Sequence, residues 1–258
     1  MNRIDSKFSE LRSAGGKALV GYLTAGDPDM ARSEQDIRDA LENGVDVLEL
    51  GMPFSDPTAD GPTIQAAAQR ALAAGATLSK VLDLVGRIRA DFDTPIVLFG
   101  YANPLFHYGY DKLCADAAAV GVDGLLVVDL PHEETEEIRS AMDANGLHFI
   151  PLVAPTTPKP RMRAILEDAH GFVYYILVTG VTGARAELAT GVAEHVALIR
   201  DCTDLPVAVG FGISSGQQAR EAAAAADGVV VGSALVQAAR ADRLPEFVRE
   251  LRQGLDCE

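Results

Sequence analysis

The stretch that decides the fold reads VDVLELGMPFSDPTADGP and spans residues 45–62. It begins as an apolar strand, and a glycine and two prolines then end the strand before a helix expected over residues 63–74. One carboxylate, Glu49, lies near the carboxyl end of the strand, where apolar neighbours disfavour its ionised form. The second, Asp60, lies on the loop that follows. Two carboxylates placed this differently suit two distinct acid/base or electrostatic roles around one small substrate.

The same alternation of a strand and a helix recurs along the whole chain. Short apolar runs that read as strands cover residues 18–23, 46–51, 95–101, 124–130, 148–153, 172–178, 206–211 and 228–232. Eight is the number that a closed parallel βα barrel needs, and near-continuous apolar runs are typical of strands covered on both faces. The sequence therefore predicts an α/β fold, a single-domain (β/α)8 TIM barrel over residues 1–258.

Two further features refine this prediction. A helix over residues 4–14 precedes the first strand and is expected to close the barrel floor. No linker or charge block divides the chain, which favours one domain. The alternative is an open doubly wound sheet, but no G-x-G-x-x-G fingerprint follows the first strand. Helix starts are expected at Ser33, at Thr77 and at Ser214 or Ser215, which are capping residue types.

Composition excludes several classes of protein. The 258 residues are 48% apolar and carry a formal net charge of −15, which disfavours binding to nucleic acid or to anionic membranes. No apolar run reaches membrane-spanning length, and the first residues are too charged for a signal peptide. Cys114, Cys202 and Cys257 are odd in number and widely spaced, which argues against disulfides or zinc and favours a cytoplasmic location.

Glycine-rich turns follow three of the expected strands and predict a phosphate site. They cover residues 180–183, 210–214 and 232–233, and Ser214 and Ser233 stand at expected helix starts. Backbone N–H groups at such positions bind anions, and the loops after strands seven and eight are the recurrent phosphate site of this barrel. The active site is therefore expected at the carboxyl ends of the strands.

Each candidate residue also has a structural interpretation. Glu49 would be structural if an arginine or backbone donors paired with it, but no arginine lies nearby in sequence, and an unpaired buried charge is costly. Taken alone, Asp60 reads more simply as a cap for the following helix. The tyrosines at 22, 101, 174 and 175 are more often packing residues than ligand contacts. The five histidines share no metal-ligand spacing, and Arg185 reads equally well as a solvated charge.

The motif over residues 48–65 closely resembles the signature of the tryptophan synthase alpha subunit family. The resemblance continues, in order along the chain, through residues 23–28, 101–104, 153–157, 180–185, 210–214 and 232–234. It implies a TIM barrel of aromatic amino-acid biosynthesis that cleaves indole-3-glycerol phosphate to indole and glyceraldehyde 3-phosphate. It further implies an alpha2-beta2 heterotetramer, in which the beta subunit holds pyridoxal phosphate and receives the indole. This chain itself is expected to need no cofactor and no metal.

The resemblance also assigns roles to single residues. Glu49 is implied to be the acid/base and Asp60 the partner of the indole N–H, with Tyr174 supporting both. The implied phosphate and gating-loop residues are Thr182, Gly183, Gly212, Gly232 and Ser233, and Phe211 in the same turn counts among the substrate-binding residues. Tyr22 and Tyr101 are implied to wall the indole pocket. The chain departs from the family pattern at three positions of the pocket lining, namely Gly100, Ala102 and Leu177.

Two other functions compete with this one. Another phosphate-binding barrel, such as an isomerase of histidine or tryptophan biosynthesis, would share the glycine turns but is not expected to carry Glu49 and Asp60 in this motif. A regulatory barrel would bind indole-glycerol phosphates without turnover, and an assay of indole release separates these possibilities.

Overall fold

Parallel strands follow one another around the centre of the molecule. The computed structural model describes residues 1–177, 185–210 and 212–256, and for residues 185–190 it describes the backbone alone. The strands are β1 (Ala18–Thr24), β2 (Val47–Gly51), β3 (Ile96–Gly100), β4 (Gly124–Val127), β5 (His148–Phe149), β6 (Leu152–Val153), β7 (Val173–Ile176), β8 (Val207–Gly210) and β9 (Gly228–Val231). All pairs are parallel, and the order across the sheet is β5-β4-β3-β2-β1-β9-β8-β7-β6.

The two ends of this order are pieces of one interrupted strand. Only Ile150 and Pro151 separate β5 from β6. The N–H of Ile150 donates to the carbonyl of Leu125 at 2.9 Å, and the N–H of Tyr174 donates to the carbonyl of Pro151 at 2.9 Å. Because one short segment bonds to β4 on one side and β7 on the other, the sheet closes on itself. The barrel prediction is confirmed, the doubly wound alternative is wrong, and the expected strand 148–153 is divided in two.

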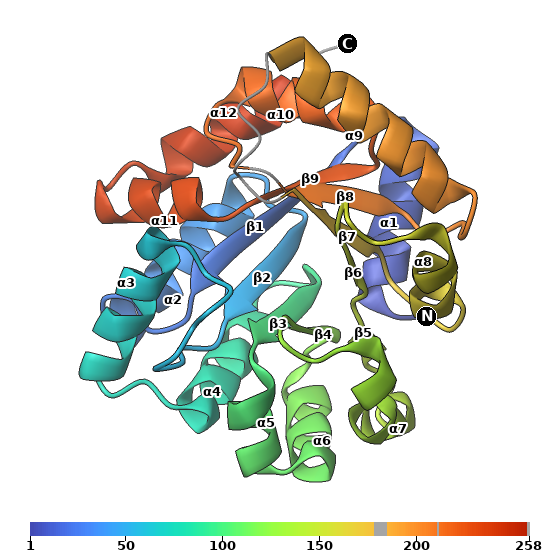
Figure 1. Cartoon of the computed structure of the whole chain (residues 1–258). Coiled ribbons are helices and arrows are strands. Elements are labelled where there is room, and N and C mark those ends of the chain that lie inside the picture. Colours follow the sequence, from blue (N-terminus) through green and yellow to red (C-terminus); the bar gives the residue numbers. More distant parts are fainter. Residues whose placement is uncertain (178–184, 211, 257–258) are drawn as a thin grey trace.

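Helices surround the strands (Figure 1). They are α1 (Arg3–Ala14), α2 (Met30–Glu42), α3 (Pro62–Ala73), α4 (Leu78–Arg89), α5 (Ala102–Tyr108), α6 (Tyr110–Val120), the 3-10 helix η1 (His132–Glu134), α7 (Glu136–Ala144), α8 (Lys159–Leu166), α9 (Arg185–Arg200), α10 (Gly216–Ala223), α11 (Ser233–Arg240) and α12 (Leu244–Asp256). Among the residues that the structure describes, no helix is both long enough and apolar enough to cross a membrane.

The floor of the barrel is filled by α1, as the sequence predicted. Alternate strand residues point inward, since strand side chains alternate between faces. The inward residues of the lowest layers form one buried cluster of Ala18, Val20, Val47, Val97, Leu126, Ile150, Phe172, Ala208 and Val230. Ile4 and Phe8 of α1 join this cluster and are 0% and 4% exposed. The polar site must therefore lie above this layer, toward the carboxyl ends of the strands.

One of the predicted helix starts is wrong. The cap of α2 is Asp29, whose Oδ1 accepts hydrogen bonds from the N–H groups of Ala31 and Arg32 at 3.0 and 2.9 Å. Ser33 lies inside the helix, and its hydroxyl accepts a hydrogen bond from the N–H of Gly26 at 2.9 Å. Thr77 and Ser215 cap α4 and α10, as expected.

Candidate active site

A polar layer lies directly above the apolar floor of the barrel. Two residues beyond the inward valines of β1 and β2 stand Tyr22 and Glu49, which are partners in the strand register. Likewise, Phe99 of β3 lies two residues beyond Val97, and Tyr174 of β7 lies two residues beyond Phe172. Because strand side chains alternate, all four point into the barrel near its carboxyl end. This places an acid and two phenols where barrels of this type hold their active sites.

Glu49 is a carboxyl group held without a partner. Its side chain is 0% exposed, and neither carboxylate oxygen has a hydrogen-bond partner in the described parts of the chain. Loss of water around the group raises the pKa of Glu49 to about 8, so the carboxyl stays protonated at neutral pH. The structural alternative required an arginine or backbone donors, and within residues 1–177, 185–210 and 212–256 none is found. An unsatisfied buried carboxyl costs stability, which favours a catalytic role.

Asp60 lies on the loop between β2 and α3. Its Oδ2 accepts a hydrogen bond from the hydroxyl of Tyr101 at 3.0 Å, and the same hydroxyl accepts one from the N–H of Ala59 at 3.1 Å. Burial raises the pKa of Asp60 to about 6, which leaves it mostly ionised at neutral pH. Helix α3 begins with Pro62 after the cap residue Gly61 and has no side-chain cap. The interpretation of Asp60 as a helix cap is therefore wrong.

An ion pair fixes the helix that follows this loop. Arg70 of α3 binds Asp27, after β1, through two hydrogen bonds of 2.7 Å. Phe54, in the same loop as Asp60, is half-buried and packs on Tyr101, with ring centroids 5.3 Å apart. Tyr101 thus holds the loop by a hydrogen bond to Asp60 and by ring contact.

The tyrosines Tyr22 and Tyr174 complete the wall of the cavity. The hydroxyl of Tyr22 lies 3.3 Å from that of Thr24, and its ring meets Phe99 edge-on at 5.2 Å. Burial raises the pKa values of Tyr22 and Tyr174, and the charges of Glu49 and Asp60 raise them further. This influence places the two carboxyl groups and the two phenols near one another at the carboxyl end of the barrel.

Sequence reasoning missed two residues that shape this cavity. Phe99 faces the ring of Tyr22, and its position could have been found from the alternation along residues 96–100. Gly51 has no side chain because a Cβ there would lie 2.2 Å from the hydroxyl of Tyr22. The sequence alone does not reveal this close contact between Gly51 and Tyr22, since it depends on the register between β1 and β2.

The two helix starts near the predicted phosphate site, those of α10 and α11, differ in their hydrogen bonds. The cap position of α11 is Gly232, which makes no side-chain hydrogen bond, so the first N–H groups of α11 have no side-chain acceptor. At α10, by contrast, the N–H of Ser214 donates to Gln218 and that of Gly216 donates to Glu250. The N–H groups of Ser214 and Gly216 are thus already bonded, whereas at the start of α11 no side chain of the described residues caps Gly232 and Ser233.

Some of the remaining predicted site residues lie within the described part of the chain, and others do not. Gly212 follows β8 with a φ of +63°, a conformation that glycine adopts readily. Thr182, Gly183 and Phe211, and the side chain of Arg185, lie outside the described residues. Gly100 departs from the family pattern because the Met52 side chain fills its place, with Cε 2.5 Å from where a Cβ would lie. The described residues contain no group of three or more potential metal ligands.

Comparisons with known proteins agree with this geometry. The family model described as "Tryptophan synthase alpha chain" matches residues 8–253. A tryptophan synthase alpha chain from Geobacter sulfurreducens is 51% identical, over 97% of this chain and 95% of the relative. The crystal structure of tryptophan synthase subunit alpha from Legionella pneumophila superposes with a TM-score of 0.91 at 38% identity, covering 99% of both chains. A structure of Mycobacterium tuberculosis tryptophan synthase gives a TM-score of 0.93 at 37% identity, over 100% and 99% of the two chains. The chain therefore belongs to the tryptophan synthase alpha chain family.

Proposed function

We propose that this chain is a carbon–carbon lyase that cleaves indole-3-glycerol phosphate to indole and glyceraldehyde 3-phosphate. The observation that carries the proposal is Glu49, a fully buried carboxyl group without a partner among the described residues, which lies with Asp60 near Tyr22. Its environment keeps a proton available at neutral pH, while Asp60 nearby keeps its charge. Environments that push two carboxyl pKa values apart separate an acid from an anion.

The two groups suit the two needs of the reaction. Cleavage of the bond between indole C3 and the glycerol chain requires a proton at C3 and removal of the proton from the adjacent hydroxyl. Glu49 delivers its proton to C3, and its carboxylate then collects the hydroxyl proton as the carbonyl of the aldehyde forms. Asp60 accepts a hydrogen bond from the indole N–H and stabilises the positive charge of the indolenine. Tyr101 holds Asp60 in place, and Tyr22, Phe99 and Tyr174 line the cavity.

The direct test uses purified protein and indole-3-glycerol phosphate. Indole release is measured with this chain alone and after addition of a tryptophan synthase beta subunit. Release of indole and an equal amount of glyceraldehyde 3-phosphate is the expected result. A saturable complex with the substrate that yields no indole under either condition would instead indicate a regulatory barrel.

The rate of indole release is expected to depend on pH as a bell. Asp60 must be ionised, so the rate should fall as the pH drops below about 6. Glu49 must start protonated, so the rate should also fall above about pH 8. The measurement is kcat/KM between pH 5 and 9.5, because this ratio reports the pKa values of the protein without bound substrate. Asp60→Asn should remove the acidic limb from its residual activity, and a flat profile in the unmodified protein would contradict these assignments.

The phosphate group is expected to bind at the start of α11. A Cβ added at Gly232 would lie 3.7 Å from the nearest side-chain atoms, an ordinary contact, so Gly232→Ala should fold normally. The same Cβ would hinder close approach of a phosphate to the backbone, and we expect glycerol phosphate to bind roughly tenfold more weakly. Calorimetry measures this affinity, and Gly86→Ala in α4 is the matched control. Equal affinities in the two variants would place the phosphate elsewhere.

Partner, location and domain organisation belong to the same proposal. We infer an alpha2-beta2 complex in the cytoplasm, with pyridoxal phosphate in the beta subunit and no cofactor in this chain, which acts as one domain over residues 1–258. Several related structures are complete tryptophan synthases, which supports a beta-subunit partner. Free thiols at Cys114 and Cys202 are in keeping with a reducing compartment. Phe106 of α5 is 65% exposed and its ring meets that of Tyr110, and we place the proposed docking surface for the beta subunit at this helix.

Addition of a beta subunit is expected to raise the weak lyase activity of the isolated chain. Phe106→Ser should shift the midpoint of this titration to roughly tenfold higher beta-subunit concentration, because an exposed aromatic anchor is lost. Leu198→Ser changes another exposed apolar residue, on α9, and serves as the control. A titration unaffected by Phe106→Ser would move the docking surface away from α5.

A further inference from the structure

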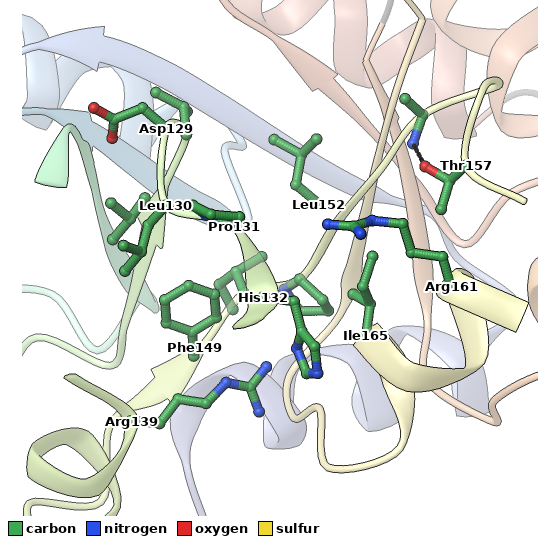
Figure 2. A pocket seen from close by; sticks show the side chains of 15 residues that line it. Asp129, Leu130, Pro131, His132, Arg139, Phe149, Leu152, Thr157, Arg161 and Ile165 are labelled. Atoms are coloured by element: carbon green, nitrogen blue, oxygen red, sulfur yellow. Dashed lines mark hydrogen bonds between the residues drawn. The ribbon is translucent and has the colours of Figure 1, made fainter. Parts of the chain in front are cut away.

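A cavity of about 330 Å³ lies in the side wall of the barrel, where the strand ladder is interrupted. Pairing between β4 and β5 ends at Leu125 and Phe149, whereas β6 pairs with β7 instead. The cavity is bordered by the ends of these strands, by η1 and α7 on one side, and by α8 on the other (Figure 2). Two sequence motifs without a role in the proposed reaction line it, one over residues 129–131 and one that includes Ala154 and Thr157.

Two buried nitrogen atoms without partners in the described part of the chain belong to residues that line this cavity. Arg139 of α7 stacks on Phe149, with its Cζ 5.0 Å from the ring centroid, and its Nη1 donates to the carbonyl of Asp168 at 3.2 Å. Its Nε is buried and has no hydrogen-bond partner in the described part of the chain, and the same holds for Nδ1 of His132. Figure 2 shows the guanidinium of Arg139 directed toward the imidazole of His132. A buried donor left without an acceptor is costly, so these atoms are suited to receive an acceptor from outside.

The charge of Arg139 also lacks a close counterion. Among the described residues, no carboxylate oxygen lies within 4.0 Å of its guanidinium nitrogens, and burial lowers its pKa from the usual value. Arg161 of α8 also lines the cavity, but Glu133 of η1 already neutralises it through two hydrogen bonds of 2.7 and 2.9 Å. Asp143 and Asp168 act on the charge of Arg139 from farther away. The cavity thus presents one positive charge without an ion-pair partner among the described residues, in a protein with a net charge of −15.

The rest of the lining mixes polar groups, Asp129 and Thr157 among them, with apolar side chains. Leu130, Pro131, Phe149, Leu152 and Ile165 form its walls. A volume near 300 Å³ is at the lower limit for pockets that hold small organic ligands, and such pockets combine apolar walls with a few polar groups that orient the ligand. A hydrated inorganic ion would leave these walls unused, whereas an apolar body carrying one anionic group would use both.

We infer that this lateral cavity binds a small organic anion, whose carboxylate or phosphate group accepts hydrogen bonds from Arg139 and His132 while its apolar body contacts Leu130 and Ile165. The site is separate from the proposed lyase site, whose residues Tyr22, Glu49 and Asp60 do not line it. The two sites share a wall, because Leu152 lines the cavity and is the register partner of Tyr174. An occupant of the lateral cavity therefore lies one strand away from the proposed catalytic layer.

The test is calorimetric binding of three probes to the full chain. The probes are 3-phenylpropionate, the uncharged 3-phenylpropanol and inorganic phosphate, which separate the contributions of charge, apolar body and type of anion. We expect saturable binding of 3-phenylpropionate, at least roughly tenfold weaker binding of the alcohol, and weaker binding of phosphate. Equal binding of acid and alcohol, or phosphate as the tightest ligand, would overturn the proposal.

Variants place the bound probe in the molecule. Arg139→Met should weaken binding of 3-phenylpropionate roughly tenfold or more, and Arg163→Met, an exposed charge on α8 outside the cavity lining, should not. Ile165→Trp fills the cavity without removing a charge and should abolish binding, which keeps the test decisive if Arg139→Met does not fold. Unchanged binding in either cavity variant would overturn the proposal. Loss of binding in Gly232→Ala would do so too, because it would place the probe at the mouth of the barrel.

Discussion

Glu49→Gln is expected to abolish the release of indole from indole-3-glycerol phosphate. Glutamine has nearly the shape of the protonated glutamic acid, but it neither delivers a proton to indole C3 nor collects one from the hydroxyl. General acid/base catalysis contributes roughly 10²–10⁴-fold, and here one group serves both proton transfers, so the loss should reach at least this range. Steady-state indole release, with and without a beta subunit, measures the effect. Activity within a few-fold of the unmodified protein would remove Glu49 from the mechanism.

The stability of Glu49→Gln shows whether its loss of activity comes from the missing proton or from unfolding. The folded protein holds the Glu49 proton up to about pH 8, whereas the ordinary pKa of a glutamate carboxyl is 4.5. The unmodified protein should therefore lose stability as the pH rises from 4.5 to 8, because only the unfolded chain releases this proton. Glu49→Gln lacks this loss and should be the more stable protein at pH 8, by on the order of a few kcal/mol. Glu42→Gln, at an exposed position on α2, should leave both activity and stability unchanged.

Asp60→Asn is expected to lower kcat by roughly 10²–10³-fold. The change keeps the side-chain size but removes the negative charge that faces the developing positive charge of the indolenine. By analogy with loss of an oxyanion-hole donor, the cost is about 2.7–4 kcal/mol of transition-state free energy. Because α3 has no side-chain cap, the variant should fold as the unmodified protein does. Single-turnover cleavage with the isolated chain measures the loss at the chemical step.

A control in the same loop removes a negative charge at a position other than that of Asp60. Asp56 is exposed and bonds only to neighbouring Ser55 in the described contacts, so Asp56→Asn should leave cleavage by the isolated chain nearly unchanged. Near-normal turnover in Asp60→Asn, or equal losses in both variants, would show that the Asp60 carboxylate does not stabilise the intermediate.

The barrel could be predicted because the same pattern of an apolar strand followed by a helix recurs along the chain. Each strand is an apolar run that carries the same information, and the capping residues Thr77 and Ser215 mark helix starts by local chemistry alone. Local chemistry does not identify the helix start where two residues of capping type lie close together, as Asp29 and Ser33 do near the start of α2. It also fails at β5 and β6, since Pro151 and the divergence of neighbouring strands divide a run that is uniformly apolar in sequence.

The candidate site was predictable only in part. The burial of Glu49 follows from its place in an apolar strand, and its position near the strand end follows from the prolines behind it. The contact between Tyr101 and Asp60 depends instead on how a loop folds back over 41 positions of sequence. The same limit applies to Gly51 under Tyr22 and to Glu250 at the start of α10, which are contacts between distant segments. Such contacts leave no pattern in a single sequence.

The central claim is that the cavity keeps the Glu49 carboxyl protonated at neutral pH. The most direct measurement is a carbon-13 NMR titration of the glutamate side-chain carboxyl groups, in which subtraction of the Glu49→Gln spectra isolates the signal of Glu49. The structure predicts a midpoint near pH 8 for this signal. A midpoint near the ordinary glutamate value of about 4.3 would show an ionised Glu49 at neutral pH and would contradict the mechanism.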